Sequence, residues 1–595
     1  MGRDTSRNRK PQSRLPEQRE YVGVLSLTWR GGYVVPNHKQ FKRDIFIPDH
    51  LLGRASDGDK VMVRLTDWKR YKHYPEGEII AVMGRAGDND TEMNSILAEF
   101  GLPYEYPENA VAEAAEIEDG ITEQEVLRRK DMRDVTTFTI DPADAKDFDD
   151  AISFQQADDS DNQTPDSGSG MASKMYEIGV HIADVTHYVR PDTVLDREAY
   201  ARATSVYLVD RVVPMLPERL SNGICSLRPG EDKLCFSVIF RMDEEANVSK
   251  YNIKRTVIRS NRRFSYDEAQ ERIETGTGDY AEELLTLNRL AQKLRERRMQ
   301  QGAIDFERDE VGFKVDENGK PTEVFFREQK EANQLIEEFM LLANKTVAEY
   351  TGKKQGSVFV YRVHDVPDPD KLEELQKFVS NFGYRLDVSA QKRTSYAMNT
   401  LMRQVEGSPE QDLIQLLALR SMAKAVYSTK NIGHYGLAFP YYTHFTSPIR
   451  RYPDMMVHRL LSQYMKGRSI TDADSLEDRC KHCSEQEQLA AQAERASIKY
   501  KQVEFMQDNV GKEFDAVIIS VTDWGFYVEV TENKCEGLVP IRTLSEQFDD
   551  TFFADEKTFT VEGINTGRRF RLGDKVRVKL TSANLEKKQL DFVLA

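Results

Sequence analysis

The sequence predicts a multidomain α+β protein in which a central mixed α/β block is flanked by two small closed β-barrels. Its 595 residues exceed what a single hydrophobic core holds, so several domains are expected. Short strand-like runs separated by turn residues occupy both ends, whereas the middle of the chain mixes strand and helix patterns. A hydrophobic content of 39% is typical of globular domains, and no apolar run reaches the length of a membrane span.

The first barrel is predicted over residues 20–88, after a basic, polar tail (1–19) that we expect to be disordered. Five apolar runs alternate with Gly, Asn, Asp and Pro signals and read as strands: 20–27, 31–36, 43–48, 60–65 and 77–83. Five short strands with tight turns favour an OB-type barrel, a fold that binds single-stranded nucleic acid.

Aromatic and basic residues are interleaved in this first barrel, most densely over Trp68–Tyr74. Such a mixture is unsuited to a core, whereas it allows bases to stack on the rings while the cations meet phosphates. We therefore select Trp68, Lys69 and Tyr71 as candidate RNA-binding residues. For any other single ring of the barrel, a core position is an equally good interpretation.

Residues 89–133 are acidic and helical in pattern and are interpreted as a connector to the central block, 134–465. Within that block, Ser265–Glu268 forms a capping box, and Ala281–Gln301 reads as an amphipathic helix closed by Gly302. Asn333–Tyr350 also reads as a helix. An insertion rich in Asp, Ser and Gly, Asp158–Lys174, is expected to be disordered.

A polar helical connector, 466–509, leads to the second predicted barrel, 510–595. Five strand-like runs and the basic segment Arg568–Lys588 indicate another OB-type barrel with an aromatic and basic face. Trp524 and Phe526 are the candidate RNA-binding rings on that face. The net charge of −16 opposes nucleic-acid binding only as a sum, because much of the acid lies in probable linkers.

The decapeptide Asp141–Asp150 (DPADAKDFDD) lies between two apolar strand-like segments and carries five aspartates. Clustered carboxylates raise one another's pKa values, so a cluster near a core requires a neutralising cation. Oxygen ligands without nearby Cys or His suit Mg²⁺, with Mn²⁺ as the alternative, rather than zinc. Because Mg²⁺ held by carboxylates commonly serves phosphate chemistry, the segment indicates a phosphodiesterase or phosphotransferase.

Two other interpretations of the decapeptide remain open at this point. Acidic runs are commonly solvated loops, and a calcium loop of the EF-hand type would need a central Gly that is absent here. In an extended segment Asp147 and Asp149 share a face, whereas Asp150 faces away unless the backbone turns.

Other residues with ligand chemistry are assigned structural roles. His181, Asp184 and His187 belong to a strand-and-turn segment, and Cys480 and Cys483 fall in a helical stretch without a second ligand pair. Five cysteines indicate a reducing compartment, and the N-terminus has no apolar leader, so we expect a cytoplasmic protein without membrane contact.

Long motifs give the chain a recognisable resemblance. TIDPADAKDFDDAI, GVHIADVTHYV, VPMLPERLSNGICSL, IEEFMLLAN and HYGLAFPYYTHFTSPIRRYPDMMVHRLL resemble the catalytic (RNB) domain of the ribonuclease II/ribonuclease R family, closer to its ribonuclease R branch. The first barrel resembles a cold-shock domain, and the second resembles an S1 domain. The resemblance extends over nearly the whole chain from about residue 20.

The resemblance implies a processive 3′-to-5′ exoribonuclease that hydrolyses single-stranded RNA to nucleoside 5′-monophosphates. It implies a magnesium site formed by Asp141, Asp147, Asp149 and Asp150. The catalytic residues it implies are Asp149, Asp150 and Arg450.

Further RNA contacts are expected from Tyr207, Tyr361, Arg450 and Arg451, although one of the two adjacent arginines should serve structure. Single-stranded RNA is the expected partner of a monomer, with proteins of RNA decay or the ribosome as candidate partners. Two other function classes remain, a non-catalytic RNA-binding protein and a magnesium-dependent DNA nuclease or other phosphodiesterase. Intact aspartates and Arg450 argue against the first of these.

Overall fold

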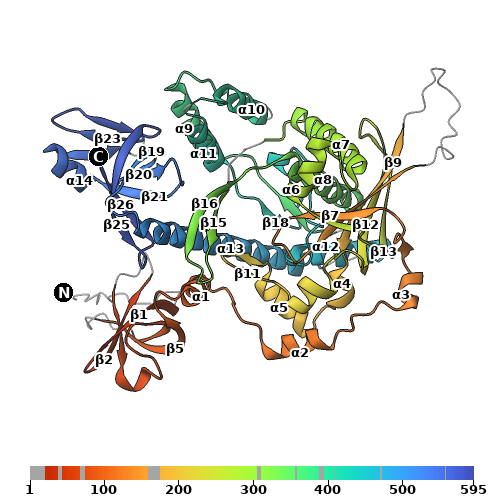
Figure 1. The fold of residues 1–595 in the computed structure, drawn as a ribbon, viewed down its shortest axis with the longest axis horizontal. Coiled ribbons are helices and arrows are strands. Elements are labelled where there is room, and N and C mark those ends of the chain that lie inside the picture. The colour runs from red at the N-terminus through yellow and green to blue at the C-terminus, as the bar shows by residue number, and fades with distance from the viewer. Residues whose placement is uncertain are drawn as a thin grey trace, which may run out of the picture.

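Two closed β-barrels lie at one end of the molecule and a large mixed body lies at the other (Figure 1). The computed structural model describes residues 20–37, 43–67, 74–157, 174–304, 310–354, 358–387, 394–408, 410–468, 472–555 and 558–595. The predicted tail, 1–19, and most of the predicted insertion, 158–173, lie outside these ranges. The arrangement confirms the predicted fold class, with a mixed α/β body between barrels.

The N-terminal barrel closes in the strand order β1-β2-β3-β5-β4. Its strands are β1 (Glu20–Thr28), β2 (Gly31–Pro36), β3 (Ile45–Pro48), β4 (Asp59–Asp67) and β5 (Glu76–Arg85). Alternate residues such as Leu25, Val34 and Val63 fill its interior. Gly31 closes the first hairpin at φ 131°, where a side chain would meet the carbonyl oxygen of Ile47.

The predicted connector folds into α1 (Asn89–Glu99), α2 (Glu108–Glu116) and α3 (Glu123–Leu127). Helix α1 packs its apolar side against the long helix α13 (Ala473–Gln507). Helix α13 has 35 residues and therefore runs for about 50 Å, from the body to the C-terminal barrel (Figure 1). It contacts the connector helix α1, elements of the body, and two strands near the C-terminal end of the chain, β25 (Lys575–Asn584) and β26 (Gln589–Leu594).

The body is built on a seven-stranded sheet in the order β14-β7-β8-β9-β12-β13-β6. The strands are β6 (Lys130–Asp131), β7 (Thr137–Asp141), β8 (Asp150–Gln156), β9 (Met175–Ala183), β12 (Asp232–Asp243), β13 (Val248–Arg259) and β14 (Arg262–Ser265). The outer pairs β14–β7 and β13–β6 are parallel, and the central pairs are antiparallel. Strand β9 is buried along almost all of its length, as a central strand covered on both faces should be.

Helices cover both faces of this sheet (Figure 1). On one side lie α6 (Tyr266–Thr275), α7 (Ala281–Gln300) and α8 (Glu331–Gly352), and on the other α4 (Val185–Tyr188) and α5 (Val194–Arg202). Ser265 and Glu268 form the predicted capping box of α6. Helix α12 (Tyr452–Met465) contacts α4, α8 and α13.

The C-terminal barrel closes in the order β19-β20-β21-β26-β25. Its strands are β19 (Glu513–Thr522), β20 (Gly525–Val530), β21 (Glu536–Pro540), β25 (Lys575–Asn584) and β26 (Gln589–Leu594). An insertion that the sequence did not predict follows β21, namely α14 (Ile541–Phe548), β22 (Phe552–Asp555), β23 (Thr560–Gly563) and β24 (Arg569–Arg571).

Smaller elements complete the structure. Helices α9 (Pro369–Ser380), α10 (Thr394–Val405) and α11 (Gln411–Ser421) share a separate core that includes Leu572 of the C-terminal barrel. Paired strands form β10 (Val206–Tyr207) with β11 (Val212–Val213), β15 (Glu310–Val315) with β16 (Pro321–Arg327), and β17 (Tyr361–Val363) with β18 (Val426–Ser428). In the described ranges, every helix is too short or too polar to cross a bilayer.

Candidate active site

The four predicted metal-binding aspartates come together where β7 ends and β8 begins. Asp141 is the last residue of β7, Asp150 is the first of β8, and Asp147 and Asp149 lie in the loop between them. Phe148 packs into the core, so its two neighbours take the opposite face. The backbone turns before β8, and the carboxylate of Asp150 interacts with those of Asp141 and Asp149.

Hydrogen bonds from neighbouring elements hold the aspartate loop. The hydroxyl of Ser226 accepts a bond from the backbone N–H of Phe148 (3.0 Å) and donates to the carbonyl of Lys146 (2.8 Å). The Arg263 guanidinium donates to the carbonyl of Pro142 (2.6 Å). At the far end of the loop, the N–H of Ala183 in β9 donates to the carbonyl of Asp149 (2.9 Å). The loop is therefore fixed on both flanks.

Asp149 is the most deeply buried of the four, with 4% of its surface exposed. Its Oδ1 accepts a hydrogen bond from the backbone N–H of Ile449 (2.8 Å). Its Oδ2 has no hydrogen-bond partner and lies 3.6 Å from Nε of Arg450. Asp141 likewise has a buried Oδ2 without a partner. Two desolvated carboxylate oxygens are thus left without a donor at one place.

Burial controls the protonation of these carboxylates. Burial, followed by the charge of Asp150, raises the pKa of Asp141 to about 8. Burial also raises the pKa of Asp150 to about 6, and it raises the pKa values of Asp147 and Asp149 although Arg450 opposes the shift. A cation placed here would lower these pKa values again. The electrostatics of the four carboxylates therefore favour the binding of a cation.

The loop that precedes α12 places Arg450 against Asp149. Asp454 organises this loop, because its Oδ2 accepts hydrogen bonds from the N–H of Ser447 (2.7 Å) and from the guanidinium of Arg451 (2.8 Å). The Arg450 guanidinium donates to Ser447 Oγ (3.0 Å), and its side chain remains 40% exposed. Arg450 can therefore reach a ligand at the aspartates.

The expected RNA contact from Arg451 is wrong for this structure. Its guanidinium is bound to Asp454, and the side chain is largely buried. Arg451 thus makes the kind of contact that was expected of one of the two arginines. Arg451 fixes the loop, and Arg450 faces the aspartates.

Tyr207 lies on the β10–β11 hairpin with 37% of its surface exposed, next to the charges of Arg450, Asp147 and Asp149. The same hairpin also holds Arg450, because the N–H of Ser205 donates to the Arg450 carbonyl (2.9 Å). The expected stacking residue is therefore brought close to the clustered aspartates.

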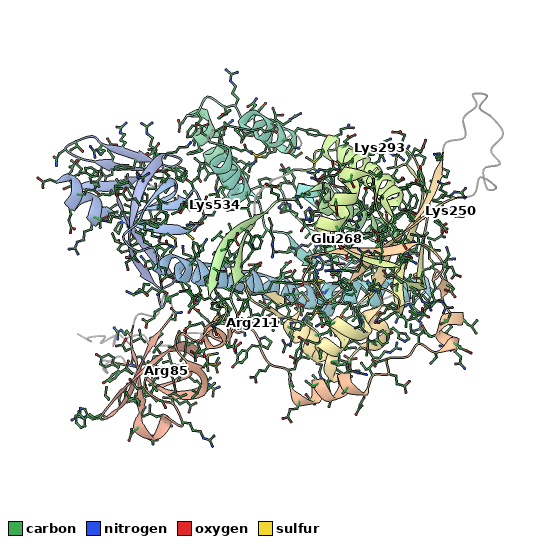
Figure 2. All side chains as sticks on the ribbon, viewed as in Figure 1. Arg85, Arg211, Lys250, Glu268, Lys293 and Lys534 are labelled. Carbon is green, nitrogen blue, oxygen red and sulfur yellow. The ribbon has the colours of Figure 1, made fainter. Side chains whose placement is uncertain are left out.

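A polar node ties this hairpin to the rest of the molecule. The Asn89 amide at the start of α1 donates to Asp210 in the hairpin turn (2.6 Å) and accepts from Lys501 of α13 (2.7 Å). Arg211 of the turn pairs with Asp90 (2.6 Å), and Figure 2 labels Arg211 at this junction. The position of Tyr207 is thereby linked to the connector and to the helix that carries the C-terminal barrel.

Two predicted stacking rings are buried, so their expected roles are corrected. Tyr361 is 5% exposed and packs near Phe359, and Phe526 is fully buried in the core of the C-terminal barrel. Neither ring has a free face for a base. Trp524, by contrast, is 76% exposed, whereas Trp68, Lys69 and Tyr71 lie outside the described residues.

The residues predicted to be structural are bound to protein partners. His181 is buried between the hydroxyls of Ser237 and Ser153, each at 2.8 Å. Asp184 pairs with Arg129 (2.8 Å) and with Arg255. Cys480 and Cys483 are buried helix residues with free thiols, as expected.

One residue at the site was missed from the sequence. Tyr266 opens helix α6 and lies close enough to Asp150, Asp141 and Arg450 for their charges to affect its pKa, which burial raises. Strands β14 and β7 are parallel and pair Ser265 with Asp141, so both end at the same edge of the sheet. The capping box identified the start of this helix, but the sheet order that brings it to the aspartates was not visible.

The chemical type of these oxygen ligands suits a hard divalent cation, but their positions do not form a complete coordination site. Carboxylate oxygens, two of them unpartnered, are what Mg²⁺ or Mn²⁺ requires. Among the described residues, no group of three or more His, Cys, Asp or Glu side chains is arranged to hold a metal as it stands. Magnesium is commonly held by one or two carboxylates together with substrate phosphates, so a complete protein cage is not needed.

Models of known families match almost the whole chain. The RNB domain model matches residues 129–467, the cold shock domain model residues 33–107, and the S1 RNA binding domain model residues 507–594. The RNB match contains all four aspartates, Tyr207 and Arg450.

Known proteins are similar to this chain over nearly its whole length. Ribonuclease R of Aquifex aeolicus (strain VF5) is 38% identical over 94% of this chain and 78% of its own length. Ribonuclease R of Thermotoga maritima is 37% identical over 96% of this chain and 80% of its own length. The apo form of Mycoplasma genitalium RNase R superposes with a TM-score of 0.88 at 25% identity, covering 97% of this chain and 90% of that one.

Proposed function

This chain belongs to the RNB family and is a 3′-to-5′ exoribonuclease, and from that premise we propose that it degrades single-stranded RNA processively to nucleoside 5′-monophosphates, using Mg²⁺ held by its clustered aspartates. A fold alone would not carry this proposal, because one fold serves many functions. The observation that carries it is the group of four desolvated aspartates beside Arg450, with unpartnered oxygens on Asp141 and Asp149.

RNB-family exoribonucleases generally depend on a divalent metal. In this chain Asp141, Asp147 and Asp149 would hold it, and Asp150 would complete or orient the site. When bound, such a cation supplies Lewis-acid catalysis of phosphodiester hydrolysis by water. Among the described residues, the charges of Arg450, Arg263 and Arg451 offset the burial of these carboxylates only in part, because their pKa values remain raised, which supports a site built for an added cation.

Arg450 would stabilise the charge that develops on the phosphate under attack. Its guanidinium is always protonated and offers several donors in one plane, which suits phosphate oxygens. It lies 3.6 Å from Asp149 and is 40% exposed, so a phosphate at the aspartates is within its reach. Loss of one such electrostatic contact typically costs about a hundred- to a thousandfold in rate.

Tyr207 would position the RNA by stacking on a base next to the aspartates. Stacking tolerates any sequence because every base has a π-face, as a general degradative enzyme requires. The exposed rings of Trp29 in the first barrel and Trp524 in the second would extend these contacts along the strand. Arg30 lies over the Trp29 ring at 3.9 Å, which combines a cation with a stacking surface.

The test is incubation of a 5′-labelled single-stranded RNA with the protein and Mg²⁺, beside a DNA oligomer of the same sequence. The expected result is collapse to a short 5′ fragment without a ladder of intermediates, abolished by EDTA, with the DNA left intact. RNA that stays intact while bound would contradict the proposal and indicate a binding protein. Equal loss of the DNA would indicate a general phosphodiesterase.

A further inference from the structure

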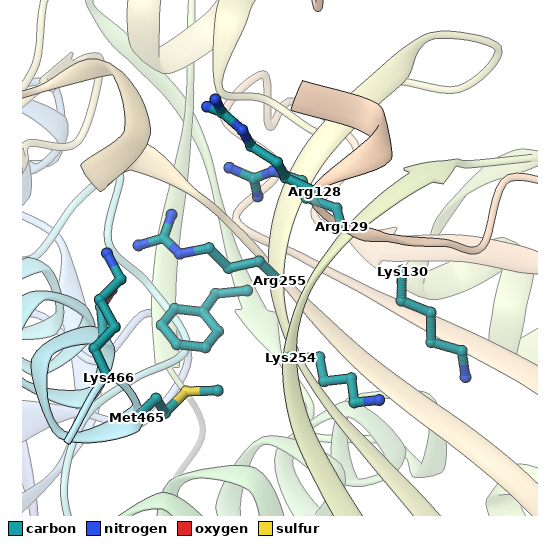
Figure 3. A pocket seen from close by; sticks show the side chains of 9 residues that line it. Arg128, Arg129, Lys130, Lys254, Arg255, Met465 and Lys466 are labelled. Atoms are coloured by element: carbon teal, nitrogen blue, oxygen red, sulfur yellow. The ribbon is translucent and has the colours of Figure 1, made fainter. Parts of the chain in front are cut away.

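A pocket lined mainly by basic residues lies on the body, separate from the aspartates. It has a volume of about 540 Å³, which falls in the range of small-molecule sites, roughly 300–1,000 Å³. No acidic residue lines it, whereas six basic residues do: Arg128, Arg129, Lys130, Lys254, Arg255 and Lys466 (Figure 3). The protein as a whole has a net charge of −16, so this local concentration of basic side chains is unusual for its surface.

The pocket is formed by three elements that meet at the edge of the sheet. Arg128 to Lys130 follow helix α3, Lys254 and Arg255 belong to β13, and Lys466 ends helix α12. Helix α12 starts directly after Arg451 and has 14 residues, so its two ends are about 20 Å apart. The catalytic arginine loop lies at one end of this helix and the basic pocket at the other.

Four of the cations face the same space. Figure 3 shows Arg128, Arg129, Arg255 and Lys466 directing their charged ends to one side, while Lys130 and Lys254 extend to the other. Figure 3 also shows Met465 beside this space. Its side chain is 41% exposed and gives the pocket an apolar wall.

The chain neutralises these four cations only in part. Arg129 binds Glu125 and Asp184, each at 2.8 Å, and these two carboxylates also serve Arg128 (3.7 Å) and Arg255. Lys466 makes no ion pair within the described part of the chain. Four positive charges therefore share two negative ones.

His187 adds no charge to this balance near neutral pH. It lies 3.6 Å from Glu125, and burial lowers its pKa, so the ring is neutral there. The pocket consequently retains an excess of two positive charges. Arg129 itself is buried and held by both carboxylates, so the positive charge that a ligand can reach lies on Arg128, Arg255 and Lys466.

We propose that this pocket binds a phosphomonoester, with a nucleoside monophosphate as the ligand that fits its size. A phosphomonoester carries about −1.5 to −2 charges at neutral pH and three acceptor oxygens, which matches the excess of two. One arginine guanidinium group can donate two parallel hydrogen bonds to two such oxygens. A phosphodiester of an RNA strand carries one charge, and the cations converge on one space instead of forming a stripe. Binding at this pocket requires no hydrolysis of RNA at the aspartates and is separate from the proposed function.

The test follows the methyl signal of Met465 by NMR in the Asp149→Asn protein with EDTA, so that the aspartate site holds no metal. The probes are adenosine 5′-monophosphate, inorganic phosphate, adenosine and a single-stranded RNA. We expect a saturable shift of the Met465 signal with adenosine 5′-monophosphate and with phosphate, and none with adenosine. The proposal would be overturned if adenosine shifted the Met465 signal as adenosine 5′-monophosphate does. It would also be overturned if the RNA strand were the only probe that shifted the signal.

Variants locate the binding. Arg128 and Lys466 are exposed, so replacing both with Gln leaves the fold intact and should weaken adenosine 5′-monophosphate binding by about tenfold or more. The matched control is Lys250→Gln, an exposed lysine on the same strand β13 that does not line the pocket and is labelled in Figure 2. The control should leave the affinity unchanged. Equal affinities of the double variant and the control would overturn the assignment.

Discussion

Two kinds of buried carboxylate lie on neighbouring strands of one sheet, and their surroundings are opposite. The aspartates proposed to bind the metal adjoin β8, where burial raises the pKa of Asp141 to about 8. Asp184 directly follows β9 and is almost fully buried, but Arg255 and Arg129 overcome burial and lower its pKa to about 2. Asp184 has its counterions within the chain, whereas the group of four aspartates has too few.

The difference separates structure from function at this sheet. A buried charge is stable when it is paired, so Asp184 can serve as a permanent link between Arg129 and Arg255. Desolvated carboxylates without partners are costly, and they persist where a ligand supplies the missing charge. The missing counterion, more than burial or acidity, therefore marks the candidate metal site.

The largest expected effect is on catalysis. Asp149→Asn should reduce RNA hydrolysis by at least about a thousandfold, because it removes a cation ligand and the partner of Arg450. RNA binding should be retained, since the stacking residues are untouched. The matched control is Asp144→Asn in the same decapeptide, where the side chain is exposed and full activity is expected. Substantial turnover by the Asp149 variant would defeat the assignment.

The next effect concerns stability and tests the other half of the comparison. Asp184→Asn should lower the free energy of unfolding by about 3–5 kcal/mol, because it leaves the buried Arg129 and the partly exposed Arg255 short of a counterion. Asp232→Asn is the control, since this partly exposed carboxylate pairs with Arg259 and Arg133 and should cost less than about 1 kcal/mol. Equal losses in urea denaturation would show that Asp184 is not a special buried link.

A smaller effect is expected on RNA affinity. Tyr207→Ala should weaken binding of single-stranded RNA by about 1–3 kcal/mol or change the length of the end product, because one base loses its stacking surface. Tyr207→Phe keeps the ring and should behave like the unaltered protein. Affinities measured in EDTA, where hydrolysis is suppressed, give the comparison, and an unchanged Tyr207→Ala protein would exclude the stacking role.

The last comparison is a pH dependence of opposite sign for the two kinds of carboxylate. The folded pKa of Asp141, about 8, lies above its ordinary value of 3.8. Its stabilising contribution is therefore present below about pH 4 and is lost as the pH rises toward 8. The Asp184 contribution is present above about pH 4 and is lost as the pH falls toward 2.

In EDTA, the free energy of unfolding should fall with rising pH more steeply than in an Asp141→Asn variant, by up to about 1.4 kcal/mol per pH unit. Added Mg²⁺ should remove this difference above neutral pH because it stabilises the ionised form. Parallel pH profiles of the two proteins in EDTA would mean that Asp141 is not desolvated as described.

The parts of the fold set by local pattern could be predicted from the sequence. Alternating strands with Gly and Asp turns identified both barrels, and the capping box at Ser265 identified the start of α6. The aspartate decapeptide indicated where the candidate metal site lies, because clustered carboxylates next to a core require a neutralising cation. In these cases the physical cause lies within a few residues of chain.

The parts set by tertiary packing could not be predicted. Whether an aromatic ring is free depends on distant neighbours, so Tyr361 and Phe526 were expected on the surface and are core residues. The division of labour between Arg450 and Arg451 depends on where Asp454 points. The partners of Asp184 come from two elements far away in sequence, and its role as a counterion was therefore invisible.

The most direct measurement is the binding of Mn²⁺, as a paramagnetic stand-in for Mg²⁺, followed by electron paramagnetic resonance with and without a short RNA. The account predicts saturable binding that tightens with RNA, is lost in Asp149→Asn, and is unchanged in Asp144→Asn. Binding that is equal in all three proteins would contradict the claim that the unpartnered aspartates form the metal site.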